Sequence, residues 1–208
     1  MAQEPESRED LPIVAFDFDG TMTVRDSFTA FLRWRTPAWR WALGGIRLIP
    51  ATLAYLVHRD RGRIKIEASR VFLAGVPRQT LEAEAARFAA SHARRLLRPD
   101  AVAAFHRWSG QGVRRIIVTA SPEMVVAPFA RGLGADDLIG THFAFDAEDR
   151  ITGDFAGPNC RGAEKVVRLQ ARYGAGMRLQ AAYGDTDGDA EMLAAAEEPY
   201  YRVFTERP

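Results

Sequence analysis

Side chains that could do chemistry stand in four places along the sequence. These are residues 17–21 (DFDGT), Thr119, Lys165 and the acid-rich run 184–189 (GDTDGD). Carboxylates, hydroxyls and lysines are the groups that nucleophilic, acid–base and metal-assisted reactions use. Residues two apart at a strand end point the same way, so Asp17 and Asp19 are predicted to face one site. Gly20 lets the chain turn sharply away after them.

The elements that must position these groups alternate between strands and helices. Apolar runs before Asp17, over 113–121 and over 179–184 are predicted to be buried strands, with 200–204 as a last strand. Helices are predicted over 80–97, 99–108, 161–172 and 189–198, and a β-hairpin over 141–155. This alternation predicts an α/β domain with a parallel sheet, in which functional residues gather at the carboxyl ends of the strands.

One helix start is read from its local sequence. Ser121-Pro122-Glu123 follows the second predicted strand. Serine is a preferred N-cap, and proline is favoured at the first helical position. A helix capped by Ser121 is therefore expected here.

Composition limits the classes of function. The chain has 208 residues, of which 47% are hydrophobic and 26% charged, which is ordinary for a soluble globular protein. The net charge of +1 argues against nucleic acid as a partner. A single cysteine, Cys160, excludes an intrachain disulfide, fits a reducing compartment and is interpreted as a core or loop residue. The scattered histidines form no metal-ligand spacing.

No targeting or spanning segment is found. Residues 1–10 are polar and acidic, and they are predicted to be a disordered lead-in rather than a secretory signal. The most apolar stretch, 41–57, is interrupted by glycine, arginine and proline, and it is shorter than the ~20 apolar residues that a membrane span needs. We expect a cytoplasmic protein.

Taken in order, the four places resemble the haloacid-dehalogenase (HAD) superfamily. That family has an apolar strand followed by DxDGT, a second strand followed by serine or threonine, a lysine, and a final GDxxxD. The resemblance spans residues 13 to 204. A strand-end turn without chemistry would explain residues 17–21 alone, but not all four motifs in this order. The implied fold is a Rossmann-like parallel-sheet core with a mainly helical cap inserted after the first strand.

The resemblance implies a role for each matching residue. Asp17 matches the nucleophile, which forms an aspartyl-phosphate, and Asp19 matches the general acid and base. Thr119 and the backbone N–H of Ala120 match the groups that bind a phosphoryl oxygen. Lys165 matches the cation that holds the nucleophile and the phosphate together. An aspartate at position 19 favours a phosphatase over a dehalogenase.

The resemblance also implies Mg²⁺ as the cofactor. Its expected ligands are Asp17, Asp185 and the backbone carbonyl of Asp19, with Asp189 holding a metal-bound water or supporting the site. Mg²⁺ prefers octahedral oxygen coordination and keeps several waters, so few carboxylates suffice. Asp187 is interpreted as a turn residue.

The long segment before Thr119 is where the superfamily branch called subfamily IB, which includes phosphoserine phosphatase, carries a helical cap. The implied division is a core over 11–21 and 99–208, with a cap over 22–98. In phosphoserine phosphatase, a glutamate and a cap arginine hold the charged groups of the amino acid. Asp26 falls at the glutamate position by ungapped spacing, and it reads equally well as a helix cap. Arg70 or Arg63 could stand in for the arginine.

The first half of the cap mixes aromatic residues, arginines and apolar residues. Three interpretations stay open: a membrane interface, a pocket for an apolar substrate tail such as that of a lysophospholipid phosphate, and ordinary packing within the cap. The aromatic residues and arginines are Trp34, Trp39, Trp41, Arg33, Arg35, Arg40 and Arg47.

The sequence therefore predicts a Mg²⁺-dependent phosphomonoesterase that acts on a small phosphorylated metabolite, with phosphoserine or a lipid-like phosphate as candidates. Two alternatives come from other classes. One is a membrane-associated scaffold or regulator with this fold and little turnover. The other is a phosphotransferase that passes the phosphoryl group to an alcohol.

Overall fold

The computed structural model describes residues 11–58 and 61–208. The lead-in predicted over residues 1–10 lies outside the described residues. None of the helices in the described part of the chain is both long and apolar enough to cross a membrane. The predicted cytoplasmic location is not tested by this finding and stays a prediction.

A five-stranded parallel sheet forms the centre of the molecule, in the order β3-β2-β1-β6-β7. Its strands are β1 (Ile13–Phe16), β2 (Arg114–Pro122), β3 (Asp137–Thr141), β6 (Leu179–Gly184) and β7 (Glu198–Tyr201). The predicted α/β class and parallel sheet are confirmed. β1 is central, and the chain runs from it to β2 on one side and later returns to β6 on the other. Such a change of direction opens a crevice at the carboxyl ends of the strands.

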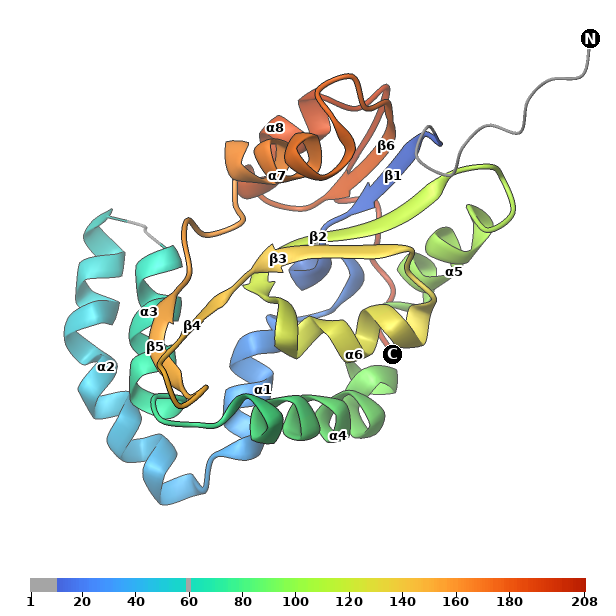
Figure 1. Cartoon of the computed structure of the whole chain (residues 1–208). Coiled ribbons are helices and arrows are strands. Elements are labelled where there is room, and N and C mark those ends of the chain that lie inside the picture. Colours follow the sequence, from blue (N-terminus) through green and yellow to red (C-terminus); the bar gives the residue numbers. More distant parts are fainter. Residues whose placement is uncertain (1–10, 59–60) are drawn as a thin grey trace, which may run out of the picture.

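The four residues of β1 are fully buried because both faces of the sheet are covered. Side chains alternate between faces, so Ile13 and Ala15 belong to one apolar cluster, and Val14 and Phe16 to the other. Helices α7 (Ala163–Tyr173) and α8 (Ala190–Ala194) cover the first face. Helices α5 (Pro99–Arg107) and α6 (Glu123–Leu133) cover the second face (Figure 1).

A helical segment is inserted between β1 and β2. After a tight turn over Phe18–Met22, it contains α1 (Ser27–Arg35), α2 (Ala38–His58), α3 (Arg61–Phe72) and α4 (Arg78–Leu96). The chain enters and leaves this segment side by side, because Thr23 forms an antiparallel bridge with Leu97. The division into core and cap at residues 22 and 98 stays a prediction. We call α1–α4 the cap.

A two-stranded hairpin lies against the cap (Figure 1). It consists of β4 (Phe143–Phe145) and β5 (Ile151–Phe155), which pair antiparallel as predicted. Ile151 donates its N–H to the carbonyl of Val76 at 2.9 Å and accepts the N–H of Gly75 at 2.7 Å. These bonds join the hairpin, which belongs to the core segment, to the connection between α3 and α4.

Three predicted boundaries were wrong. Ser121 does not cap α6. It belongs to β2, and its hydroxyl donates to Asp19. Pro122 occupies the N-cap position of α6. The helix expected over 189–198 stops at Ala194 because the chain leaves it to pair beside β6. The strand expected over 200–204 begins at Glu198 and ends at Tyr201, since Arg202 has a φ of 55°.

Phe88 of α4 links the cap to the core. Its ring is fully buried and contacts Phe31 of α1 at 5.5 Å and Phe129 of α6 at 5.8 Å between centroids. Phe129 in turn contacts Phe18, which lies between the two predicted site aspartates, at 5.6 Å. The aromatic cluster therefore extends from the cap to the end of β1.

Removing this ring should destabilise the whole protein. We expect Phe88→Ala to lower the free energy of unfolding by about 3–5 kcal/mol, because a large buried ring leaves a cavity. Urea denaturation followed by circular dichroism measures the change. Val167→Ala, at an exposed site on α7, is the control and should change stability by less than about 0.5 kcal/mol. Equal stability of the two variants would contradict this account of the packing.

Candidate active site

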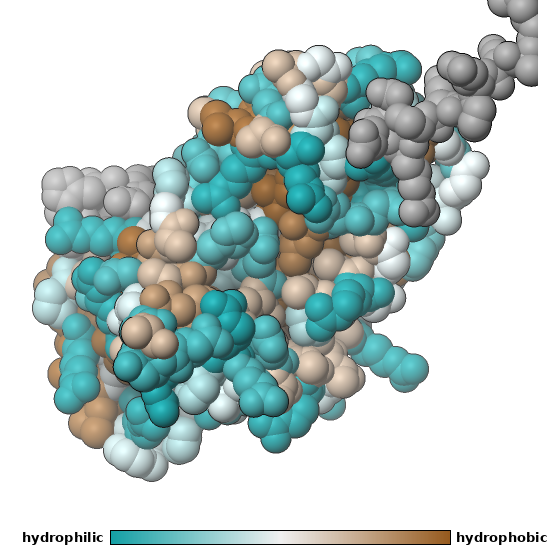
Figure 2. Space-filling model, in the orientation of Figure 1, coloured by the Kyte–Doolittle hydropathy of each residue, from teal (hydrophilic) through white to brown (hydrophobic). Residues whose placement is uncertain are grey.

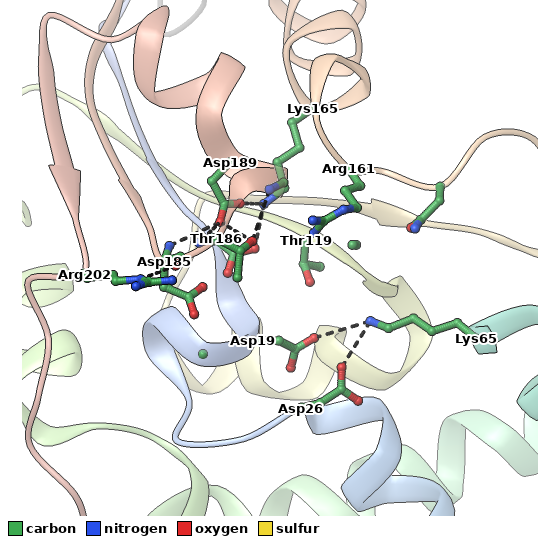
Figure 3. Close-up of a pocket in the computed structure, with 15 residues that line it drawn as sticks. Asp19, Asp26, Lys65, Thr119, Arg161, Lys165, Asp185, Thr186, Asp189 and Arg202 are labelled. Carbon is green, nitrogen blue, oxygen red and sulfur yellow. Dashed lines mark hydrogen bonds and ion pairs between the residues drawn. The ribbon is translucent and has the colours of Figure 1, made fainter. Parts of the chain in front are cut away.

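A cavity of about 390 Å³ lies at the carboxyl ends of β1, β2 and β6 (Figure 3). Among the residues that line it are eight that the sequence predicts at the site: Asp17, Asp19, Asp26, Thr119, Ala120, Lys165, Asp185 and Asp189. The geometry therefore brings the predicted residues together. Their chemical roles remain predictions.

Lys165 joins two carboxylates beneath the cavity. It comes from the first turn of α7, and its side chain is 1% exposed. Its Nζ donates to Asp17 Oδ1 at 2.6 Å, to Asp189 Oδ1 at 2.6 Å and to the carbonyl of Val118 at 2.8 Å. An ammonium group has three N–H donors, so all of them are used. The lysine is fixed in place before any ligand binds.

Burial and these ion pairs shift the pKa values in opposite directions. Burial raises the pKa of Asp17 to about 7, although Lys165 opposes this rise. Burial alone would lower the pKa of Lys165, but Asp17 and Asp189 raise it above its ordinary value. Lys165 therefore stays charged at neutral pH. A further cation beside Asp17 would favour the carboxylate form that a nucleophile needs.

Asp19 is held from three sides. Its Oδ1 accepts the backbone N–H of Ser27 at 2.7 Å, and its Oδ2 accepts the hydroxyl of Ser121. Lys65 of α3 lies 3.9 Å from the same Oδ2. Burial and the neighbouring Asp26 raise the pKa of Asp19, and Lys65 opposes them. A carboxyl group whose pKa is raised holds its proton more readily, as a general acid must.

An acidic cluster faces the cavity from β1 and from the turn after β6. Oxygens of Asp17, Asp185 and Asp189 lie within 4.8 Å of one another. Gly20 makes this possible, because a Cβ at that position would lie 2.4 Å from Asp185 Oδ2. Hard oxygen donors packed this closely suit Mg²⁺. The residues therefore fit the predicted cofactor.

Within this cluster, Asp189 has its oxygens occupied by protein groups. Oδ2 accepts the N–H of Asp185 at 3.2 Å and both the N–H and the hydroxyl of Thr186 at 3.0 Å, while Oδ1 accepts from Lys165. These bonds and Lys165 lower its pKa although burial opposes them. Asp189 is thus better suited to position the turn and the lysine than to donate to a metal directly.

Thr119 lies at the end of β2 and is fully buried. Its Oγ1 accepts the N–H of Ser121 at 3.0 Å, which leaves the hydroxyl proton available to a ligand. The carbonyl of Ala120 accepts from the Thr141 hydroxyl at 3.1 Å. That bond orients the Ala120 peptide beside Thr119 at the cavity wall.

Asp26 caps a helix, as one of its two sequence interpretations predicts, and it also lines the cavity. Its role toward a substrate stays a prediction. Its Oδ1 accepts the N–H of Thr29 at 2.7 Å and so caps α1, while its Oδ2 lies 3.2 Å from Lys65 Nζ at the cavity. Burial would raise its pKa, but Lys65 and Thr29 lower it below its ordinary value. The carboxylate is therefore charged and already paired with a cation.

The cation that the cap brings to the cavity is Lys65, which sequence reasoning missed. Arg70 or Arg63 was the candidate from the sequence, but neither lines the cavity, and the Arg70 guanidinium binds Asp154 and Glu67 at an exposed position. Helical spacing in the sequence could have identified Lys65. Lys65 shares a face of α3 with the buried Ser69 and Phe72, whereas Arg70 falls outside that face.

Two arginines at the cavity were also missed. Arg161 pairs with Asp187 and lies just before the N-cap of α7, so helical spacing does not mark it. Arg202 follows β7 and donates its Nε to the carbonyl of Asp185 at 2.7 Å. No motif marks Arg202, because its place depends on how β7 ends.

The comparisons with known proteins agree with this geometry. The family model of the haloacid dehalogenase-like hydrolases matches residues 14–194. A relative, Protein CicA of Caulobacter vibrioides, is 54% identical over 196 residues, which cover 94% of this chain and 88% of that protein.

Solved structures share the fold. A protein of unknown function from Bordetella pertussis Tohama I is 26% identical with a TM-score of 0.71, covering 89% of this chain and 86% of that one. A phosphoserine phosphatase with an analogue of its phospho-aspartyl intermediate is 17% identical with a TM-score of 0.59, covering 90% and 84%. At that identity the second likeness shows the fold alone.

The buried lysine gives a testable stability effect. We expect Lys165→Met to lower the free energy of unfolding by about 3–5 kcal/mol at pH 8 without metal, because it leaves the carboxylates of Asp17 and Asp189 buried and unpaired. Without the lysine, the pKa of Asp17, which burial already raises to about 7, rises further, and the pKa of Asp189 rises from its lowered value. The penalty is therefore full at high pH and shrinks as falling pH protonates the carboxylates in the folded state.

Urea denaturation at pH 8 and at pH 5 measures this difference. Arg172→Met is the matched control, because Arg172 pairs with Asp137 at an exposed position of the same helix. Exposed pairs contribute up to about 1 kcal/mol. A Lys165→Met penalty that is small, or that grows at pH 5, would contradict the pairing described here.

Proposed function

The chain belongs to the haloacid dehalogenase-like hydrolase family, and from this premise we propose that it is a phosphomonoesterase that works through a phosphorylated Asp17. The observation that carries the proposal is the contact of 2.6 Å between Asp17 and the buried Lys165. Asp19 and Thr119 line the same cavity. Nucleophile, cation, acid and hydroxyl donor are thus present before substrate arrives.

The first step is attack by a carboxylate oxygen of Asp17 on the phosphorus atom of the ester. The hydroxyl of Thr119 and the N–H of Ala120 donate to phosphoryl oxygens, and Lys165 offsets their charge. The bond between phosphorus and the leaving oxygen breaks as the bond to Asp17 forms. Asp17 then carries the phosphoryl group as an acyl phosphate.

Asp19 acts first as the general acid and then as the general base. In its acid form it donates a proton to the leaving alcohol, for which its raised pKa suits it. As a carboxylate it then removes a proton from the water that attacks the phosphorus of the acyl phosphate. The Ser121 hydroxyl and the Ser27 N–H hold the side chain in one orientation through both steps.

Mg²⁺ would be held by Asp17, Asp185 and the backbone carbonyl of Asp19, with Asp189 supporting. When bound, it supplies charge neutralisation and orientation for the displacement. The charges that line the cavity support this assignment. Five aspartates (17, 19, 26, 185 and 189) face the cations Lys65, Arg161, Lys165 and Arg202. A bound divalent cation would make the net charge of the groups that line the cavity positive, which favours binding of a phosphate dianion.

The substrate is a small phosphorylated metabolite. Phosphoserine is a candidate because phosphoserine phosphatases share the fold. The Asp26–Lys65 pair offers both a carboxylate for an ammonium group and an ammonium for a carboxylate, at 3.2 Å from each other. If the alcohol part of the substrate carries charged groups, they would bind Asp26 and Lys65 in place of the contact between these two residues.

Removal of the nucleophile gives the most direct test. We expect Asp17→Asn to lower kcat on the order of 10⁴-fold or more while the protein stays folded. Burial raises the pKa of Asp17 to about 7, so the folded protein already tolerates an uncharged side chain at this place in part of the molecules near neutral pH. Asp149→Asn, at an exposed acid outside the cavity, is the matched control. Retained turnover in the Asp17→Asn variant would refute the assignment.

Metal dependence and substrate preference can be measured together. We expect phosphate release from a panel of phosphomonoesters to require Mg²⁺ and to stop with EDTA. The panel contains phosphoserine, sugar phosphates, glycerol phosphates, lysophosphatidate and an aryl phosphate. An added acceptor alcohol that becomes phosphorylated would instead indicate a phosphotransferase. No release from any ester by folded protein would support a scaffold or regulatory role.

A further inference from the structure

Helix α2 presents an exposed apolar face. Its members lie three or four residues apart, so they fall on one side of the helix. They are between 51% and 65% exposed, although all are large and hydrophobic. They are Trp39, Leu43, Ile46, Ile49 and Leu53. We call this set the α2 face.

The opposite side of α2 is packed against the cap. Trp41 stacks on Phe72 of α3 with a centroid distance of 4.9 Å, and a Cβ at Gly44 would lie 2.3 Å from the same ring. Leu48 also packs against the apolar core. The α2 face therefore points outward, and α2 forms the outer edge of the molecule (Figure 1). Hydrophobic side chains are visible along this edge in Figure 2.

Helix α2 carries arginines and no acidic residue. Residues 27–59 contain no aspartate or glutamate, and they contain five arginines. Arg40 and Arg47 are exposed, and their spacing of seven puts them together along one flank of the α2 face. Neither forms an ion pair with an acid in the described part of the chain. A partner for this surface should therefore be apolar at its centre and negative around it.

A second copy of the chain fits this surface poorly. Apposed α2 faces would bring like-charged arginines together without an acid to pair with them, and such contacts are unfavourable. An anionic bilayer has the complementary arrangement, with an acyl region below phosphate groups. Interfacial helices combine tryptophan and aliphatic residues on one side with basic residues beside them.

We propose that the α2 face seats the cap on the surface of an anionic phospholipid bilayer. α2 would lie in the interface plane, with the α2 face in the acyl boundary and Arg40 and Arg47 at lipid phosphates. α3 packs on the inner side of α2 and carries Lys65 into the cavity, so α3 would connect the docked helix with the cavity. The proposal does not rest on hydrolysis.

Vesicle flotation tests the proposal with the full chain. Wild-type protein is mixed with vesicles of phosphatidylcholine alone, or of phosphatidylcholine with a third of phosphatidylglycerol. We expect flotation with the anionic vesicles at low salt and at least about tenfold weaker binding to the neutral ones, since arginines contribute strongly near an anionic surface. Asp17→Asn should float like wild type, which separates docking from catalysis.

Paired variants identify the surface. Leu43→Gln/Ile46→Gln and Arg40→Gln/Arg47→Gln should each lower anionic-vesicle binding by about tenfold or more. The matched controls are Val167→Gln/Val203→Gln, two exposed apolar residues outside the cap, and Arg94→Gln/Arg95→Gln, two exposed arginines on α4. Both controls should bind like wild type, and circular dichroism checks that every variant is folded.

Several outcomes would overturn the proposal. Wild-type protein that stays unbound with anionic vesicles at low salt excludes lipid docking. Equal losses in the controls would show that general charge or hydrophobicity, and not the α2 face, carries binding. Dimers in sedimentation velocity that Leu43→Gln/Ile46→Gln converts to monomers, without flotation of the wild type, would assign the face to self-association.

Discussion

The buried ion pairs of Lys165 are the interaction on which the rest of the site depends. One ammonium joins the end of β1, the carbonyl of Val118 in β2 and the turn that holds Asp189. Burying an ammonium is costly unless its charge and all of its donors are satisfied. Three strands must therefore end at the same level around it, and the parallel order with β1 between β2 and β6 makes that possible.

Close packing of acids around this lysine requires glycines at fixed places. A Cβ at Gly184 would lie 2.5 Å from that of Asp189, and one at Gly188 would meet Arg161 at 2.1 Å. Gly20 plays the same part toward Asp185 and also has a φ of 91°. The glycines of the DFDGT and GDTDGD motifs thus do more than turn the chain. Gly20 and Gly184 leave room for the carboxylates of Asp185 and Asp189, and Gly188 leaves room for the guanidinium of Arg161.

This dependence explains how much of the site could be predicted from the sequence. Asp17, Asp19 and Asp185 stand beside strand ends and turn glycines, so their short-range pattern marks them. Lys65 and Arg202 could not be found in that way, because each reaches the cavity only through the phase of a helix or the end of a strand. Ser121 shows the same limit. Its local sequence favours a helix cap, but a contact with Asp19, 102 residues away in the chain, takes its hydroxyl instead.

Lys65 links the cap to the carboxyl group of Asp19. This residue lies on α3, donates to Ser121 at 2.9 Å and lowers the pKa of Asp19, which burial and Asp26 raise. With α3 in this position, Lys65 therefore offsets part of the rise that burial and Asp26 cause in the pKa of Asp19. The chain enters and leaves the cap at one short bridge between Thr23 and Leu97, next to the turn that carries Asp19. The residue that we propose as acid and base is thus placed where a lysine of the cap contributes to its pKa.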